Sequence, residues 1–352
     1  MPESSCDAVQ NDTLTMLAAI WQRVLHVPSV GASDNFFALG GNPQTADLLF
    51  AEIKRECQRE LSSSIIFHAP TLGALAFVLQ QPNLPKFPHF IRLKAGERKP
   101  PVFIAPGLDG RATFSGLARQ IQTEHAIYGL LAKGLDGIEE PQDRIEEMAE
   151  FYLETVTDLQ PEGPYMLIGY SFGGLVALEM AEQMLESGKT VELLVLIDAY
   201  PHPRFLATRQ RLRLAIQRSK RHVTEVRRRS FPEALSYLKS GMENRLHHAR
   251  VLHDDESSDA SPLSLARTTS RVKELSYIAL AHYRPRPYPG SIKFVKNEND
   301  RYFPGHPVPV WANLVSRLDV ETVPGSHLNM VRGQSENLAV LLTRYLKELD
   351  ER

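Results

Sequence analysis

Beyond residue 100, short apolar runs alternate with segments of helical periodicity, and this alternation constrains the fold more than any other feature. The runs are apolar throughout rather than at every second position, and they are too short for buried helices. Such strands belong to a parallel sheet that helices cover on both faces. The sequence therefore predicts an α/β fold. The expected strands are 102–105, 126–131, 165–170, 191–197 and 292–295, with helices over 143–159 and 172–187.

The first part of the chain shows a different pattern, without a convincing strand. Apolar residues recur at helical spacing from Thr13 to Leu25, and shorter helices are expected over 43–58 and 72–80. The stretch QQPNLPKFPHF follows, and its prolines resist both helix formation and strand pairing. We therefore predict a small all-α helical bundle at residues 1–84 and an α/β domain at residues 85–352, with the boundary near Leu84.

The alternation stops between about residues 201 and 282, which have the pattern of helices and polar loops. An insertion of this size in an α/β sheet most often forms a lid over the active site. From Arg204 to Arg250 the lid has thirteen Lys or Arg residues against three acids. Such a run is either a solvated helical face or a surface that attracts an acidic partner. Four apolar residues of the lid either line an acyl tunnel or pack against the sheet, namely Leu206, Leu212, Leu214 and Ile216.

Charge and cysteine content exclude several classes of protein. The formal net charge of −2 lacks the basic excess of a nucleic-acid-binding protein. Cys6 and Cys57 are the only cysteines, which favours a reducing compartment. No apolar run approaches the roughly 20 residues that span a bilayer. We expect a cytoplasmic protein without a membrane span. The spacing of His247, His248 and His253 beside Asp254 is too common to indicate a metal site, so no metal is expected.

The sequence GYSFGG at 169–174 places a Gly-x-Ser-x-Gly motif between a predicted strand and a predicted helix. In that context the motif is typical of a nucleophile elbow, in which small residues allow a sharp turn that exposes the serine above the sheet. The adjacent helix N-terminus favours developing negative charge. The pattern predicts Ser171 as a nucleophile, against the alternative of an ordinary capped turn.

A serine nucleophile requires a base and an acid that orients the base. His327 follows a last strand-like segment, VETV at 320–323, and precedes a terminal helix, which completes the chain order of serine, acid and histidine in this fold. Asp198 ends the 191–197 strand, and Asp300 follows the 292–295 strand. We predict His327 as the base and Asp198 as the acid, with Asp300 as the alternative acid.

Attack on a carbonyl carbon places negative charge on oxygen, which backbone N–H groups must stabilise. The amide of Phe172, directly after the nucleophile, is the first candidate for this oxyanion hole. The second is the amide of Gly107 or Leu108, in the loop APGLDG after the first strand. A plain glycine turn is the alternative interpretation of that loop.

The motifs AAIWQRVLHV, DNFFALGGNPQTADLL and FHAPTLGALA resemble the carrier domains of nonribosomal peptide synthetases. The resemblance covers about residues 10–82 and implies a serine that holds a phosphopantetheine arm. Pro43 stands at that serine's position. Thr45 and the serines at 62–64 lie nearby but not at the matched position. We therefore expect no covalently bound cofactor, with the pantetheine arm present only on a partner carrier. The domain is interpreted either as a decayed module or as a docking element.

The motifs KPPVFIAPGLDG, GPYMLIGYSFGGLVALEMAEQM, VELLVLIDAYPHP and VPGSHLNMV resemble the terminal thioesterase domains of nonribosomal peptide and polyketide synthases. The resemblance implies an α/β-hydrolase fold in which Ser171 accepts an acyl chain from a carrier's thiol. It also implies that the acid stands at Asp198. Many members have a histidine before the proline of the first-strand loop, where this chain has Ala105.

These observations predict a thioesterase that releases an acyl or peptidyl chain from a carrier-bound thioester, in biosynthesis of the nonribosomal peptide or polyketide type. Release would proceed by hydrolysis, cyclisation or transfer. The expected partner is an acyl- or peptidyl-carrier domain of a synthetase, with no nucleic acid. Two alternatives remain: a stand-alone carboxylesterase with the same triad, and a non-catalytic docking protein.

Overall fold

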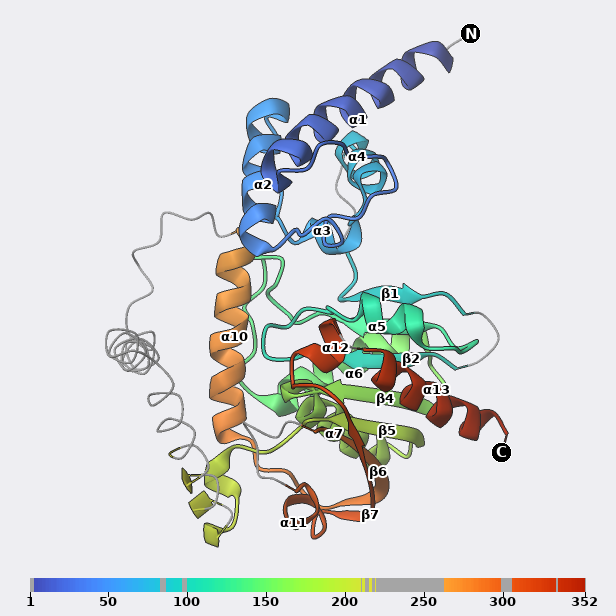
Figure 1. Ribbon diagram of the computed structural model, residues 1–352, viewed down its shortest axis with the longest axis vertical. Helices are drawn as coiled ribbons and strands as arrows, with labels where there is room; N and C mark the ends of the chain where they lie inside the picture. Colours follow the sequence, from blue (N-terminus) through green and yellow to red (C-terminus); the bar gives the residue numbers. More distant parts are fainter. Residues whose placement is uncertain are drawn as a thin grey trace.

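The computed structural model of the chain describes residues 3–82, 87–96, 100–209, 263–298, 306–333 and 335–351, together with 211, 212, 215, 216 and 219 (Figure 1). Four helices come first: α1 (Glu3–Leu25), α2 (Pro43–Cys57), α3 (Ile65–His68) and α4 (Leu72–Gln80). We call them the helical domain. They lie at one end of the molecule, and the sheet lies at the other. The predicted boundary near Leu84 falls among residues 83–86, outside the described residues.

The helical domain has an apolar core that continues into side chains of the second part of the chain, among them Leu131 and Leu265. Side chains from all four helices contribute to it, including Leu17, Trp21, Leu49, Ile66 and Leu75. Helix α2 begins at Pro43, because Asn42 caps it by accepting a hydrogen bond from the Thr45 N–H. Proline at the first helical position loses only an N–H that has no partner within the helix.

A seven-stranded sheet forms the second part, in the order β1-β3-β2-β4-β5-β6-β7. The strands are β1 (Phe90–Lys94), β2 (Val102–Ala105), β3 (Ile127–Leu130), β4 (Tyr165–Tyr170), β5 (Val191–Ile197), β6 (Tyr288–Asn297) and β7 (Val315–Val323). The strands β2 to β7 pair in parallel, as predicted.

The predicted parallel sheet has one further strand at its edge, which the sequence did not predict. Strand β1 pairs antiparallel with β3, so the sheet is mixed. None of the β1 side chains is fully buried. The strand follows the proline-rich stretch and has a neighbour on one side only, so it lacks the continuous apolar run that marks the central strands.

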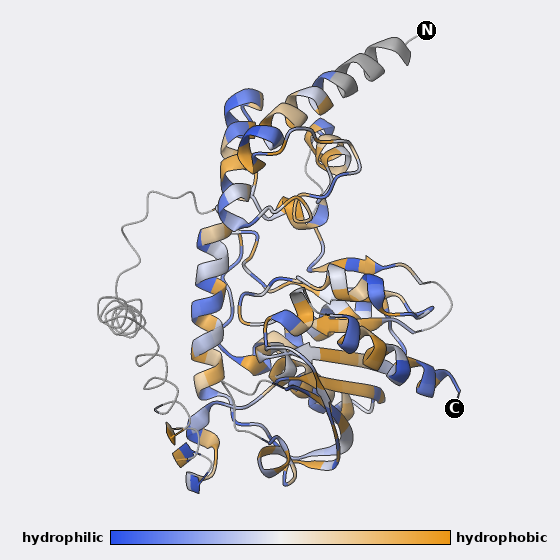
Figure 2. Cartoon of the chain, in the orientation of Figure 1, coloured by the Kyte–Doolittle hydropathy of each residue, from blue (hydrophilic) through white to orange (hydrophobic). Residues whose placement is uncertain are grey.

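Alternate residues of the buried strands point to opposite faces of the sheet, and each face has its own core. Helices α6 (Ile145–Leu159) and α7 (Phe172–Glu186) pack on one face. Helices α5 (Ser115–Gln120), α12 (Asn329–Arg332) and α13 (Glu336–Asp350) pack on the other. The central strands are the most consistently hydrophobic elements of the sheet (Figure 2). This double cover confirms the predicted α/β architecture.

Of the predicted lid at 201–282, the structure describes the short helix η1 (Pro203–Phe205), a few residues after it, and α10 (Leu265–His282). Helix α10 runs along the side of the molecule, from the helical domain towards the far end of the sheet. A further short helix, α11 (Val308–Trp311), precedes β7. Among the described residues, no helix has the length and apolar character needed to cross a membrane.

Candidate active site

Ser171 lies at the turn between β4 and α7, with backbone angles φ 56° and ψ −119°. A non-glycine residue with positive φ is uncommon and marks a sharp, strained turn. Its N–H donates to the carbonyl of Ile197 at 2.7 Å, which ties the turn to the end of β5. This geometry is that of a nucleophile elbow.

The glycines of the motif permit the close packing that the elbow requires. A side chain on Gly169 would collide with the backbone of Gly173 and Gly174. A side chain on Gly173 would collide with the carbonyl oxygens of Ala105 and Pro106. The start of α7 therefore lies directly against the loop that follows β2, because both glycines lack a Cβ.

His327 lies between Ser171 and Asp198. Its Nε2 is 3.1 Å from Ser171 Oγ, and its Nδ1 is 3.1 Å from Asp198 Oδ2. The imidazole is largely shielded, with a side-chain exposure of 16%. The structure thus brings together the three residues that the sequence singled out from the ends of β4 and β5 and the loop after β7.

Tyr170, the residue before Ser171, holds the imidazole from a third side. Its ring stacks on His327 with centroids 4.8 Å apart and planes 23° apart. Its hydroxyl donates to the carbonyl of His327 at 2.8 Å. Sequence reasoning missed this contact, although Tyr170 lies within the motif itself.

Asp198 is buried and is itself held by Asn297. The backbone N–H of Asn297 donates to Asp198 Oδ1 at 3.0 Å, and its side-chain amide donates to Oδ2. Like Ser171, Asp198 has a positive φ, of 48°. Asn297 ends β6, so the neighbouring strand orients the carboxylate that follows β5. The strand predicted from the sequence ended at residue 295, so Asn297 was not identified.

The predicted oxyanion residues lie on both sides of the elbow. Phe172 is the first residue of α7, where backbone N–H groups have no partner within the helix. Gly107 and Phe172 line the same small cavity. The Leu108 side chain instead packs against the core on the α6 and α7 face. The roles of all three as donors stay predictions.

Several predicted residues lie outside the described part of the chain: Asp300, the lid histidines His247, His248 and His253, Leu214, and most of the basic run. Of the other lid residues, Leu206 is buried, whereas Leu212 and Ile216 are exposed. Among the residues that the structure describes, no group of three or more His, Cys, Asp or Glu side chains is arranged to hold a metal ion.

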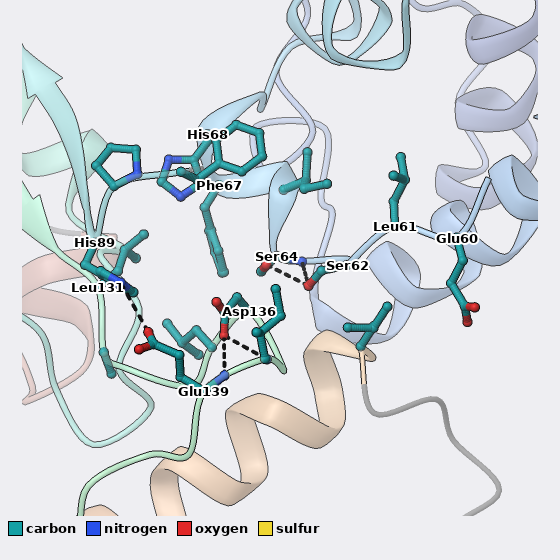
Figure 3. A pocket seen from close by; sticks show the side chains of 17 residues that line it. Glu60, Leu61, Ser62, Ser64, Phe67, His68, His89, Leu131, Asp136 and Glu139 are labelled. Atoms are coloured by element: carbon teal, nitrogen blue, oxygen red, sulfur yellow. Dashed lines mark hydrogen bonds and ion pairs between the residues drawn. The ribbon is translucent and has the colours of Figure 1, made fainter. Parts of the chain in front are cut away.

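A large cavity of about 590 Å³ lies elsewhere, between the helical domain and the sheet (Figure 3). Its lining includes His68 from α3, His89 before β1, and Glu139 from a loop after β3. Ser171, Asp198 and His327 do not belong to it. This cavity is therefore separate from the candidate active site.

Chemically, the arrangement suits acyl transfer. A hydroxyl hydrogen-bonded to an imidazole, which a buried carboxylate orients, can add to a carbonyl carbon while the imidazole takes its proton. Residues 100–345 match the family model for the thioesterase domain. The chain belongs to the thioesterase family.

Relatives of this thioesterase are large peptide synthetases. The dimodular nonribosomal peptide synthase of Bacillus subtilis (strain 168) is 37% identical over 189 residues, which are 53% of this chain and 8% of that protein. Malpibaldin synthetase of Mortierella alpina is 28% identical over 339 residues, which are 94% of this chain and 6% of that protein. The chain thus spans less than a tenth of either relative's length.

Among solved structures, the thioesterase resembles the holo form of AB3403, a four-domain nonribosomal peptide synthetase bound to AMP and glycine. The match has a TM-score of 0.57 and 23% identity, and it covers 96% of this chain and 26% of the other. At this identity the likeness shows the fold. It extends over both the helical domain and the sheet.

Residues 16–77 match the family model for the phosphopantetheine attachment site. This match contradicts the prediction that the chain has no covalently bound cofactor, because it suggests a covalently attached phosphopantetheine. The prediction depended on Pro43 alone. The match instead depends on residues 16–77 together, which include most of the helical domain. One differing residue does not remove a match over that many positions.

The start of α2 is the place where the resemblance puts the attachment residue. Pro43 stands there, and the Thr45 hydroxyl accepts from the Asn42 N–H at 2.8 Å and donates to the Asn42 carbonyl at 3.1 Å. These residues form a helix cap and include no serine, so they do not fit the arm at this point.

Proposed function

We propose that this thioesterase releases an acyl or peptidyl chain from a carrier-bound thioester through an acyl-enzyme on Ser171. The observation that carries the proposal is the continuous set of contacts from Ser171 Oγ through His327 to Asp198, in a chain of the thioesterase family. The synthetase relatives support a role in nonribosomal peptide or polyketide-type biosynthesis.

In the first half-reaction, Ser171 Oγ bonds to the thioester carbonyl carbon while His327 Nε2 takes the hydroxyl proton. The amides of Phe172 and of Gly107 or Leu108 stabilise the oxyanion. The carbon–sulfur bond then breaks, and the leaving sulfur receives the proton from His327. Asp198 keeps Nδ1 protonated, so that Nε2 faces the serine.

In the second half-reaction, water, an internal nucleophile or another acceptor attacks the ester carbonyl of the acyl-enzyme. His327 takes the proton of the attacking group and returns a proton to Ser171 Oγ. The product is accordingly a free acid, a cyclic product or a transferred acyl group. The free enzyme is regenerated in each case.

The proposal includes an organisation of the chain and a partner. We propose that residues 1–84 form a carrier-type domain, that 85–352 form the hydrolase, and that its lid extends over about 201–282. The proposed donor is the acyl- or peptidyl-carrier domain of a synthetase. The match of residues 16–77 to the phosphopantetheine attachment site and the synthetase relatives support such a donor. The cytoplasmic location stays a prediction from the cysteine content.

Thiol release from a panel of acyl and aminoacyl pantetheine thioesters tests the proposal. We expect turnover by the wild type and a fall of at least ~10³-fold in kcat for Ser171→Ala, because the nucleophile is removed. Ser187→Ala is the matched control. Ser187 is an exposed serine at the opposite end of α7 and should leave kcat unchanged.

Equal rates for the wild type and Ser171→Ala would refute the acyl-enzyme. A preference for simple oxygen esters over pantetheine thioesters would instead indicate a carboxylesterase. If a fluorophosphonate probe failed to label Ser171 and no thioester were cleaved, the chain would be a docking protein. Each outcome therefore selects one of the three functions.

A further inference from the structure

The helical domain contacts the hydrolase at the first turn of helix α10. Asp47, on α2, accepts hydrogen bonds from the backbone N–H of Leu265 at 2.6 Å and of Ala266 at 3.0 Å. It also accepts a hydrogen bond from the hydroxyl of Ser264 at 2.7 Å. Helices α2 and α10 accordingly meet end to end in Figure 1.

This contact completes the cap of α10. The first N–H groups of a helix have no partner within it, and they carry partial positive charge. Ser264 satisfies only one of them, the N–H of Arg267. The carboxylate of Asp47 satisfies two more and supplies negative charge. A residue distant in sequence therefore fixes the end of an 18-residue helix.

Two further contacts hold α10 against the helical domain. The N–H of Ser63 donates to the carbonyl of Leu263 at 3.2 Å. Leu265 and Val272 of α10 are buried in the same apolar cluster as the core of the helical domain. The position of α10 is thus set jointly by a cap, a backbone hydrogen bond and apolar packing.

The middle of α10 packs against the loop that follows β2. A Cβ on Gly110 would lie 2.7 Å from Cγ1 of Val272, so only glycine permits this approach. The N–H of Gly110 donates to the carbonyl of Gly107 at 3.0 Å. Val272 lines a small cavity together with Gly107 and Phe172, two of the three candidate oxyanion residues.

Resting on the proposed function, we propose that Asp47 is a positioning residue for thioester cleavage. By capping α10 it holds Val272 against Gly110 and so fixes the loop that carries Gly107. Asp47 belongs to the helical domain and acts on the reaction only through α10. The helical domain thereby takes part in shaping the oxyanion hole of the hydrolase.

Three variants of the whole chain test this role. In Asp47→Ala the first-turn amides lose their acceptor, and we expect kcat for thiol release to fall ~10-fold with little change in KM, because a displaced donor weakens transition-state stabilisation. Asp47→Asn should recover only part of kcat, since its single amide oxygen can accept from one of the two N–H groups and its NH2 group accepts from neither. Glu52→Ala is the control, because the Glu52 carboxylate pairs with Arg23 and Arg55, within the helical domain.

Rates are expressed per active site labelled by a fluorophosphonate, so that misfolded protein does not lower kcat. A double-mutant cycle adds a readout that a merely structural role would not produce. If Asp47 acts through Val272, the effects of Asp47→Ala and Val272→Ala on kcat should be less than additive. Additive effects, or a wild-type kcat in Asp47→Ala, would overturn the proposal.

Amide hydrogen exchange gives a readout that is independent of turnover. The N–H of Gly110 should exchange faster in Asp47→Ala than in the wild type or Glu52→Ala. Unchanged exchange would count against the coupling. A wild type that cleaves no thioester would refute the proposed function, whereas normal cleavage by Asp47→Ala would refute only the role of Asp47.

Discussion

Tyr170 holds the imidazole of His327, the proposed base, in place. Its ring stacks on His327, and its hydroxyl donates to the His327 carbonyl. An aromatic face favours a cation, so in the proposed mechanism the stack would stabilise the imidazolium. The hydroxyl restrains the loop that carries the histidine. The two contacts belong to different atoms and can be removed separately.

We expect Tyr170→Phe to lower kcat/KM about 3-fold, since only the hydroxyl contact is lost. Tyr170→Leu should lower it roughly 10-fold or more, because the stack is lost as well. Steady-state rates of thiol release by the two variants check this. Equal losses in both variants would show that the stack makes no contribution of its own.

At the residue scale, the sequence predicted the three residues that the structure brings together, because a motif and chain order mark Ser171, Asp198 and His327. It did not predict Tyr170 or Asn297 as their partners. Those contacts join residues more than 90 positions apart, and local pattern does not report them. The prediction of no covalently bound cofactor was wrong because it depended on one residue, Pro43, whereas the match depends on residues 16–77.

Helix α7 carries two buried carboxylates, Glu179 and Glu182. Glu179 accepts from the hydroxyl of Tyr283 at 3.0 Å. Glu182 lies 2.9 Å from Nε of Arg286, and Glu186 pairs with the same guanidinium at the surface. Burial, with the neighbouring Glu179, raises the pKa of Glu182 from 4.5 to about 8. Near neutral pH the folded chain therefore keeps a proton on Glu182 that the unfolded chain, with a pKa of 4.5, has already released.

This raised pKa predicts a pH dependence of stability. Between the pKa of 4.5 in the unfolded chain and about 8 in the folded chain, the native state binds the proton more tightly. The free energy of unfolding should therefore fall as pH rises through this window. Glu182→Gln, a neutral isostere, should flatten the fall. Urea unfolding at pH 5 and 8.5 measures it.

Glu154→Gln provides the control, because Glu154 is exposed on helix α6 and is not among the groups that shift the pKa of Glu182. It should keep the wild-type dependence on pH. A Glu182→Gln variant whose stability fell in parallel with the wild type would show that this carboxyl group is not the source.

At the element scale, the apolar runs predicted the central strands well, since a buried parallel strand must be apolar on both faces. Strand β1 escaped prediction because an edge strand with half-exposed side chains has no such run. Helix α1 begins at Glu3, ten residues before the periodic segment that predicted it. Periodicity reports only the part of a helix that packs against a core.

At the scale of the whole molecule, the cavity of about 590 Å³ lies between the helical domain and the sheet, and residues of both parts line it. Figure 3 shows His68 and Phe67 on one side and His89, paired with Glu139, on the other. His68 stacks on Phe87 with centroids 4.7 Å apart. Burial, with a contribution from His89, lowers the pKa of His68 from 6.5 to about 4. The two parts thus meet around a neutral imidazole.

We expect the chain to lose stability in acid partly through this residue. Between pH 6.5 and about 4 the unfolded chain binds a proton that native His68 does not, so the free energy of unfolding falls as pH falls. His68→Phe retains an aromatic ring against Phe87 and should reduce the acid loss. Unfolding at pH 7.5, 6 and 4.5 measures this. The exposed His26 gives the control His26→Asn, which should behave as the wild type; an unchanged loss in His68→Phe would exclude His68 as the cause.

The cap that Asp47 provides has a consequence for where this protein can be divided. The proline-rich stretch at 80–90 is an obvious place to truncate the chain in order to prepare the sheet as an independent fragment. In such a fragment the first amides of α10 would lack the Asp47 carboxylate as acceptor. Leu265 would be exposed, because the apolar side chains of the helical domain would no longer pack against it. A different carrier-type module grafted onto this hydrolase would need an acceptor at the same turn of its second helix. Interchangeability between modules thus depends on a carboxylate at this turn, together with apolar side chains that cover Leu265.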